Sequence, residues 1–190
     1  MSVELERAFE VYFEEIERCI HMKCYWALAH ILVVLPDVCA ALETENWETP
    51  DRGYIDWCNL YFSSKMSGQD RYSMRCVLLH QGRTVMGHRL IKSVSLVWPA
   101  DTGDIPHEVT YDFGEGRTNI PVDVTRMAED TKQAVRRWFA DLQKPENASR
   151  MSNVQRHLPW LARKGRKAIS GATGITITIP TVSSTGGYGK

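Results

Sequence analysis

One arginine and one histidine lie five residues apart on a segment that the sequence predicts to be helical. Arg75 and His80 flank the apolar run 76–79, within a helix expected over residues 67–81. Because this run leaves almost no polar face, the C-terminal half of the helix is expected to be buried. Five residues correspond to roughly 140° around a helix and about 7.5 Å along it, and the long arginine side chain can fold toward the imidazole. Arginine presents a charged planar fork that suits phosphate oxygens, and histidine exchanges protons near neutral pH. The pair could therefore act together on one phosphate.

The segment and its surroundings resemble the R-x(4–6)-H motif of HEPN-domain proteins. The likeness covers roughly residues 1–83, a series of helices with the motif on the fourth. The stretch Arg-Cys-Val-Leu-Leu-His-Gln-Gly is also similar to a set of uncharacterised bacterial HEPN-like proteins. HEPN domains are small helical bundles that usually dimerise with two motifs facing each other. Many are metal-independent ribonucleases of toxin–antitoxin or anti-phage defence systems, and others are inactive.

The resemblance implies a catalytic role for each residue of the pair. His80 would be the general base or acid when a ribose 2′-hydroxyl attacks the adjacent phosphate. Arg75 would stabilise the charge that develops on the phosphorane. It further implies a homodimer acting on RNA, with no cofactor and no metal, and an antitoxin or other protein as a possible partner.

Other features favour a structural role for the pair. The same spacing of Arg and His recurs at residues 83–88, in a predicted turn, and at 150–157, before a proline-broken segment. Active HEPN members often have Asn or Asp directly after the arginine, where this chain has Cys76. In the structural alternative, the pair bonds backbone carbonyls or an acid such as Asp37 and holds the helices together. The functional alternative is a non-catalytic HEPN-like dimeric module that binds a protein or a nucleic acid.

Basic side chains supply candidate contacts to a nucleic-acid backbone. Residues 150–167 carry six basic side chains and no acid, with His157 and Trp160 among them. Such segments can follow phosphates and stack a base, although a solvated helix end has the same composition. The expected nucleic-acid contacts are Arg71, Arg83, Arg163, Lys164, Arg166 and Lys167.

Charge is balanced over the whole chain but not along it. Lys plus Arg and Asp plus Glu each number 23. Residues 1–60 carry 12 acidic and 4 basic side chains, whereas residues 61–190 carry 11 acidic and 19 basic ones. The basic part could meet an anionic partner, or the two parts could attract each other within the fold.

The cysteines and the apolar runs predict a cytoplasmic protein without a membrane partner. The 5 cysteines are odd in number, form no C-x-x-C and lie mostly in apolar helical contexts, which favours a reducing compartment. The N-terminus is acidic and lacks the layout of a signal peptide. The longest near-apolar run, 25–41, contains a histidine, a proline and an aspartate and is too short to span a bilayer.

Hydrophobic periodicity predicts a mainly helical fold. The expected helices cover residues 3–20, 25–42, 54–62, 67–81, 125–143 and 152–167, the last interrupted at Pro159. Pro36 should kink or split the apolar, centrally buried second helix near residue 35. Ser67 and Asp70 match a capping box at the start of the fourth helix, and Gly82 suits the left-handed residue after its end.

The segment between the fourth and fifth helices predicts an inserted β-hairpin. Residues 90–98 and 107–113 have the composition of strands and are separated by a turn. Asp101, Asp104 and Asp112 surround that turn and are expected to be solvated, not metal ligands. The expected organisation is a HEPN-like helical core over residues 1–88, the hairpin over 89–124, C-terminal helices packing on the core over 125–168, and a flexible, disordered tail over 169–190.

Overall fold

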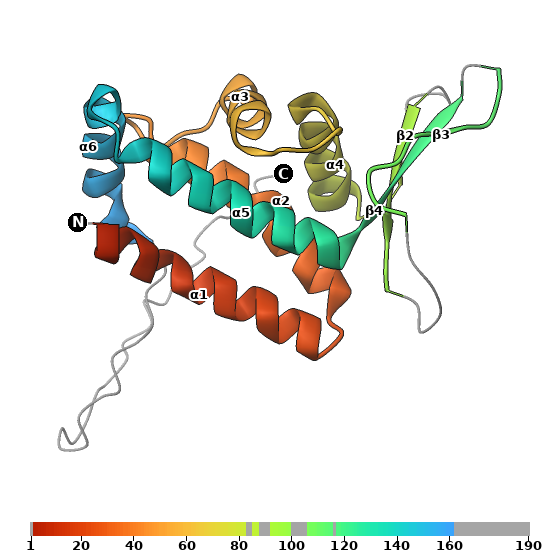
Figure 1. The fold of residues 1–190 in the computed structure, drawn as a ribbon, viewed down its shortest axis with the longest axis horizontal. Helices are drawn as coiled ribbons and strands as arrows, with labels where there is room; N and C mark the ends of the chain where they lie inside the picture. Colours follow the sequence, from red (N-terminus) through yellow and green to blue (C-terminus); the bar gives the residue numbers. More distant parts are fainter. Residues whose placement is uncertain (1, 83–84, 88–91, 100–105, 116, 162–190) are drawn as a thin grey trace, which may run out of the picture.

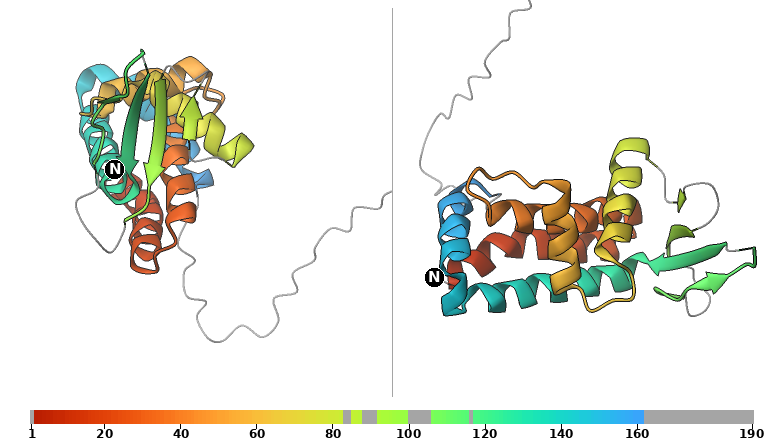
Figure 2. Two further views of the ribbon diagram at one scale, coloured as in Figure 1. Left: turned by 90° about the vertical axis from the view of Figure 1, so that its right-hand side faces the viewer. Right: turned by 90° about the horizontal axis from the view of Figure 1, so that it is seen from above.

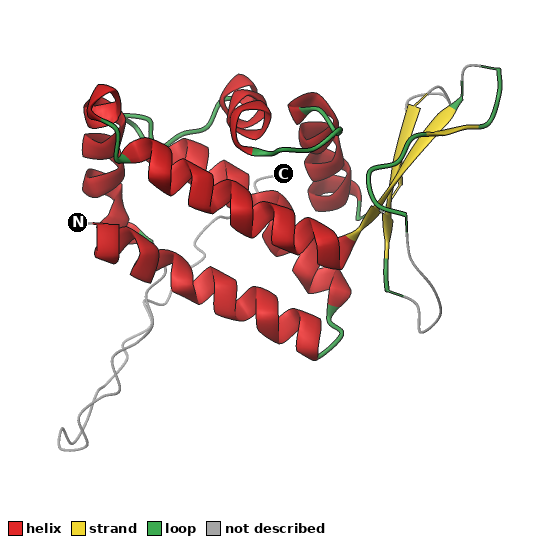
Figure 3. Ribbon diagram, viewed as in Figure 1, coloured by secondary structure: helices red, strands yellow, loops and turns green. Residues whose placement is uncertain are grey.

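The computed structural model of the protein describes residues 2–82, 85–87, 92–99, 106–115 and 117–161. Within these ranges the chain forms six α-helices, two short 3₁₀ helices and four strands. The helices make one body, and the strands form a small sheet at one end of it (Figure 3). The fold is therefore mainly helical, as the sequence predicts.

The three longest helices run alongside one another and the shorter ones surround them (Figures 1 and 2). The helices are α1 (Ser2–His21), α2 (Tyr25–Leu42), α3 (Asp51–Tyr61), α4 (Gly68–Gln81), α5 (Val124–Leu142) and α6 (Ala148–His157). Seen from above, α3 and α4 cross the long helices, while α6 closes the end opposite the sheet. α6 begins four residues earlier than the periodicity predicts and ends at His157, before the 3₁₀ helix Leu158–Trp160. The end of that predicted helix and the predicted tail lie outside the described residues.

An aromatic cluster forms the centre of the core. The ring centroid of Trp138 lies 5.6 Å from that of Phe9 and 6.3 Å from that of Trp57, and all three side chains are buried. Phe139 packs edge-on against Phe9 with their centroids 5.2 Å apart. These rings come from α1, α3 and α5, and buried aromatic rings contribute large apolar areas to stability. α5 thus shares the core of the first helices.

α2 is the central helix, as its apolar composition predicts. It contacts α1, α3, α4, α5 and α6. Among the described helices, it is the one long and apolar enough to cross a membrane by length and composition, and 56% of it is buried within the fold. α2 continues through Pro36 without interruption, so the helix is not split there.

Both ends of α4 have the predicted caps. The hydroxyl of Ser67 accepts from the backbone N–H of Asp70 at 3.2 Å, and the carboxylate of Asp70 accepts from the N–H of Ser67 at 3.3 Å. Gly82 follows the last turn with a φ of 59°, and its N–H donates to the carbonyl of Leu78. Because these bonds satisfy backbone groups that a helix end leaves without partners, α4 is fixed at both ends.

The strands form a mixed sheet in which the two predicted strands do not pair with each other, so the prediction of a single hairpin from residues 90–98 and 107–113 is wrong. The strands are β1 (Val85–Gly87), β2 (Lys92–Val97), β3 (Tyr111–Asp112) and β4 (Thr118–Asp123). Their order in the sheet is β1-β2-β4-β3. β2 and β4 are parallel, whereas β1 pairs antiparallel with β2 and β3 antiparallel with β4.

Apolar pairing across the sheet explains why β2 joins β4. Val94 lies beside Ile120 and Leu96 beside Val122, and all four side chains are buried. Burying both strands' inner faces together stabilises this register. The sequence pattern did not predict β4, because proline is rare inside strands and β4 contains Pro121. The predicted second strand shrinks to the two residues of β3.

β4 leads into α5 without a loop residue. Asp123 ends the strand and is also the N-cap of the helix. Its carboxylate accepts from the backbone N–H groups of Thr125 at 2.8 Å and Arg126 at 3.3 Å. These bonds satisfy N–H groups of the first helical turn, so the sheet and α5 are directly connected.

Candidate functional site

Arg75 lies in the middle of α4 and forms an ion pair with Asp37 of α2. One terminal nitrogen, Nη2, donates to the Asp37 carboxylate at 2.6 Å, and 21% of the arginine side chain is exposed. The guanidinium carbon lies 5.6 Å from the ring centroid of Tyr54 and 6.0 Å from that of Tyr72. Partial burial opposes the charge, but the hydrogen bond and the charge of Asp37 outweigh it and raise the pKa of Arg75. The cation is permanent and anchored.

His80 is exposed in the last turn of α4. It forms no hydrogen bond with a described residue, and the structure joins it neither to Arg75 nor to a backbone carbonyl within those residues. His80 can therefore contact a ligand from solvent, whereas Arg75 is fixed by its ion pair with Asp37.

The run between the two residues is less buried than the sequence predicts. Leu78 is buried, but Cys76, Val77 and Leu79 are each only partly covered. The expectation that the C-terminal half of α4 is buried is therefore wrong.

The two tyrosines beside Arg75 hold their phenolic protons. Burial raises the pKa of Tyr54 well above its ordinary value, and its hydroxyl donates to the carbonyl of Val33. A hydrogen bond to Asp51, followed by one to Cys76, raises the pKa of Tyr72. Neither phenol can act as a general base near neutral pH, so His80 is the better candidate for proton transfer at this surface.

Arg71 does not belong to an exposed nucleic-acid surface, which corrects the prediction for this residue. It is buried, and its Nη2 donates to Glu108 at 2.6 Å and to Ser64 at 2.9 Å. Its guanidinium carbon lies 3.7 Å from the ring centroid of Phe62. Arg71 therefore faces the interior of the protein. The other predicted nucleic-acid contacts, Arg83, Arg163, Lys164, Arg166 and Lys167, lie outside the described residues.

The recurrence of Arg and His at residues 150–157 is structural. Arg150 donates to both carboxylate oxygens of Glu43 at 2.7 Å and to Asp141 at 2.9 Å. The Nε2 atom of His157 lies 2.9 Å from the carbonyl oxygen of Thr44, and its ring is buried. These contacts attach α6 to the body. The recurrence at residues 83–88 includes residues outside the described ranges.

Sequence reasoning missed a cluster formed by His107, Glu108 and Asp130, whose ligand atoms all lie within 4.8 Å of one another. The Nδ1 atom of His107 accepts from the backbone N–H of Asp123 at 3.1 Å. Because an amide nitrogen can only donate, the ring proton lies on Nε2, which donates to Asp130 at 2.9 Å. A metal would need the lone pair on that same Nε2, so this arrangement fits a hydrogen-bond network better than a metal centre.

No sequence pattern could have detected this cluster. Adjacent His and Glu residues in a polar loop do not have the spacing of metal ligands. His107 bonds Asp130, 23 residues away, and Glu108 bonds Arg71, 37 residues away. Glu108 also has a φ of 53°, which is uncommon for a residue other than glycine. Asp112, the last residue of β3, accepts from the N–H of Gly114 and is exposed, as predicted. Asp101 and Asp104 lie outside the described residues.

Comparison with known proteins adds no relative to this description. No family model, curated protein or solved structure matches the chain. The HEPN-like assignment thus rests on the residues around Arg75 and His80 and on the order of the helices. The homodimer, the RNA substrate and the cytoplasmic location stay predictions.

Proposed function

We propose that the protein is a HEPN-like, metal-independent endoribonuclease that works as a homodimer, with Arg75 and His80 of each subunit at its site. The observation that carries the proposal is the exposure of His80 at the end of a helix capped at both termini. An exposed imidazole on a rigid element can meet the substrate directly, and it loses no internal bond when it does so. The partly exposed Arg75 lies on the same helix.

The proposed reaction needs a proton acceptor, a proton donor and a cation. His80 of one subunit removes the proton of a ribose 2′-hydroxyl, and the 2′-oxygen forms a bond to the adjacent phosphorus. The bond from phosphorus to the 5′-oxygen breaks, and that oxygen takes a proton from the second subunit's imidazolium. Arg75 stabilises the negative charge on the phosphorane oxygens. The products are a 2′,3′-cyclic phosphate and a free 5′-hydroxyl.

The ion pair with Asp37 is compatible with this role of Arg75. Asp37 accepts from Nη2, and a guanidinium has five N–H donors. A phosphate can therefore bind at the exposed edge of the guanidinium while Asp37 holds the opposite side. Fixing the arginine in advance lowers the cost of ordering it in the transition state.

The test is cleavage of RNA by purified full-length protein in excess EDTA. His80→Ala and Arg75→Ala should each lower the cleavage rate by about 10²-fold or more, because each removes a group that acts in the transition state. His21→Ala and Arg52→Ala are matched controls, since His21 is an exposed histidine in a last helical turn and Arg52 an exposed arginine. The controls should cleave RNA at the wild-type rate.

His80→Ala is the decisive variant because the exposed side chain forms no hydrogen bond with any residue that the structure describes. Circular dichroism should show that it melts like the wild type. Equal rates of RNA cleavage by the wild type, His80→Ala and Arg75→Ala would contradict the proposed catalytic role of the two residues. Loss of cleavage on adding EDTA would contradict its metal independence.

A second function is favoured by the ion pair between Arg75 and Asp37. That contact joins α4 to α2 and is the structural role that the sequence allowed for the arginine. A non-catalytic HEPN-like dimeric module that binds a protein or nucleic acid would keep this pair and need no exposed imidazole. In that case Arg75→Ala would lower the stability of the protein. His80→Ala would leave the stability unchanged, and RNA would stay uncleaved with the wild type and with the variant.

A further inference from the structure

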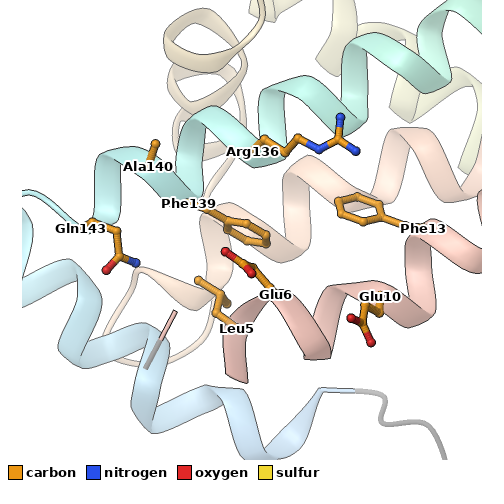
Figure 4. A pocket seen from close by; sticks show the side chains of 8 residues that line it. All are labelled: Leu5, Glu6, Glu10, Phe13, Arg136, Phe139, Ala140 and Gln143. Carbon is orange, nitrogen blue, oxygen red and sulfur yellow. The ribbon is translucent and has the colours of Figure 1, made fainter. Parts of the chain in front are cut away.

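A groove runs between α1 and α5 on the side of the body away from α3 and α4. Its volume is about 430 Å³. Figure 4 shows its lining residues, which come from these two helices and from the residue directly after α5: Leu5, Glu6, Glu10, Phe13, Arg136, Phe139, Ala140 and Gln143. Apolar side chains form the floor and polar ones the rim. A groove with these properties suits a short segment that carries both an apolar and a charged side chain.

The acidic residues of the rim have no cationic partner among the described residues. Glu6 and Glu10 are exposed and form no ion pair there. Other acids of α1 are engaged, since Glu15 pairs with Arg18 and Glu17 with Lys132. The rim also carries one cation, Arg136, whose guanidinium carbon lies 6.0 Å from the ring centroid of Phe13. The two carboxylates outnumber it, so the rim favours a cationic ligand.

The described chain ends beside this groove. α6 and the first turn of α1 lie side by side at the end of the body opposite the sheet in both Figure 1 and Figure 2. The last described residue, Leu161, is buried just beyond α6. Leu5, in the first turn of α1, and Gln143, directly after α5, line the groove at this same end of the body.

The composition of the following residues complements the groove. Residues 163–167 contain four cations, and residues 162–190 contain no aspartate or glutamate. An apolar residue, Ile169, comes two positions after the last of these cations. Eight residues beyond Leu161 reach about 26–29 Å when extended, which approaches the roughly 30 Å length of a 20-residue helix such as α1.

We propose that this groove is the docking site for the chain's own segment 163–169. Cations of residues 163–167 pair with Glu6 and Glu10, and Ile169 covers the apolar floor beside Phe13 and Phe139. Exposed ion pairs are individually weak and are screened by salt. Docking within one chain nevertheless benefits from a high effective concentration, because the covalent connection keeps the segment close to its groove.

This docking has a consequence for the basic segment that is independent of the proposed ribonuclease activity. The groove lies between α1 and α5, whereas Arg75 and His80 lie on α4. While the cations occupy the groove they are shielded from phosphates. An anionic partner of the segment must therefore compete with Glu6 and Glu10.

The test is the rate at which trypsin releases the C-terminal segment from the full chain, followed by mass spectrometry. Cleavage after residues 163, 164, 166 and 167 should be slow in the wild type. Ala140→Trp fills the groove from an exposed position, and Glu6→Lys with Glu10→Lys reverses the rim charge. Each should accelerate release by about tenfold, the effect of losing two exposed ion pairs and one covered apolar side chain.

The matched control is Glu45→Lys with Glu146→Lys, which alters two exposed acids that do not line the groove. This variant should release the segment at the wild-type rate. Sodium chloride at high concentration should accelerate release from the wild type and leave both groove variants unchanged. Circular dichroism should confirm that every variant is folded.

Two outcomes would overturn the proposal. Equal release from all variants would show that the segment does not bind in the groove. Slow release that is lost when the protein is diluted would assign the groove to a second copy or another molecule, because docking within one chain does not depend on concentration.

Discussion

The most unusual side chains of the protein are the buried ion pair of Arg71 and Glu108. Both are buried, the glutamate has a left-handed φ of 53°, and Nε and Nη1 of Arg71 have no partner among the described residues. Burying two charges is costly, and the pair and the contact with the Phe62 ring offset part of that cost. Arg71 lies three and seven residues before Met74 and Leu78, which are also buried, so helical periodicity alone could have placed it inside.

Removing one member of this pair should destabilise the protein strongly. Arg71→Met leaves the Glu108 carboxylate buried without its cation, and we expect the free energy of unfolding to fall by about 3–5 kcal/mol. Urea denaturation measures this change. Arg52→Met, at an arginine with 80% of its side chain exposed, should change it by less than about 0.5 kcal/mol.

A third variant separates the cost of the unpaired charge from other effects. Arg71→Met combined with Glu108→Gln should be more stable than Arg71→Met alone, because the buried charge has been removed. If the double variant loses stability additively, the two side chains do not interact as the 2.6 Å contact indicates.

At the scale of the elements, α4 could be predicted and the sheet could not. The caps of α4 depend on Ser67, Asp70 and Gly82, which are neighbours in sequence, so local chemistry determines them. The partner of β2 depends on the pairing of residues 92–97 with 118–123, which only the buried face of the sheet decides. Arg75 and Asp37 are 38 positions apart, so local sequence could offer their ion pair only as one of several options.

The crossing of α3 and α4 depends on Gly68. A Cβ at this position would lie 2.2 Å from the backbone oxygen of Ile55 and 2.9 Å from Oδ1 of Asn59. Gly68→Ala should therefore push the helices apart and lower the free energy of unfolding by about 1–3 kcal/mol. Thermal or urea denaturation measures the loss.

Gly53 provides the matched control for this substitution. A Cβ there would meet only Pro50 and Thr49 at ordinary distances of 3.4–3.6 Å. Gly53→Ala should be neutral or stabilise the protein by up to about 1 kcal/mol, because alanine restricts the unfolded chain more than glycine. Equal losses in the two variants would mean that the close approach at Gly68 does not limit the packing of α3 on α4.

At the scale of the whole molecule, ionised groups attach α6 to the body. Arg150 of α6 bonds Glu43, which follows α2, and Asp141 of α5. Asp141 also accepts from the hydroxyl of Tyr61, and Lys144 lies 2.8 Å from it. Lys144, Tyr61 and Arg150, in that order of importance, hold the pKa of Asp141 well below its usual range.

Stability should consequently depend on pH through Asp141. Its pKa is lower in the folded than in the unfolded state, so its contribution is present above the unfolded pKa of about 3.9 and is lost as the pH falls. Asp141→Asn should lower the free energy of unfolding by about 1–3 kcal/mol at pH 7. Urea denaturation at several pH values should show the difference from wild type narrowing below about pH 4.

The exposed pair of Asp56 and Arg52 serves as the control for this pH dependence. Asp56→Asn should change stability by less than about 0.5 kcal/mol over the same pH range, since solvent screens the pair. A constant difference between Asp141→Asn and wild type from pH 7 to pH 3 would show that the charge of Asp141 is not what stabilises the attachment of α6.

Because β4 and α5 are directly joined, the sheet and α5 should move together as one rigid unit. Asp123 belongs to both elements, and no flexible residue separates them. A tilt of β4, caused for example by a strand added at the β1 or β3 edge, must therefore rotate α5 about Asp123. Three residues of α5, together with the residue that follows it, line the groove beside α1. A displacement of the sheet at one end of the molecule would thus change the width of the groove near the other end.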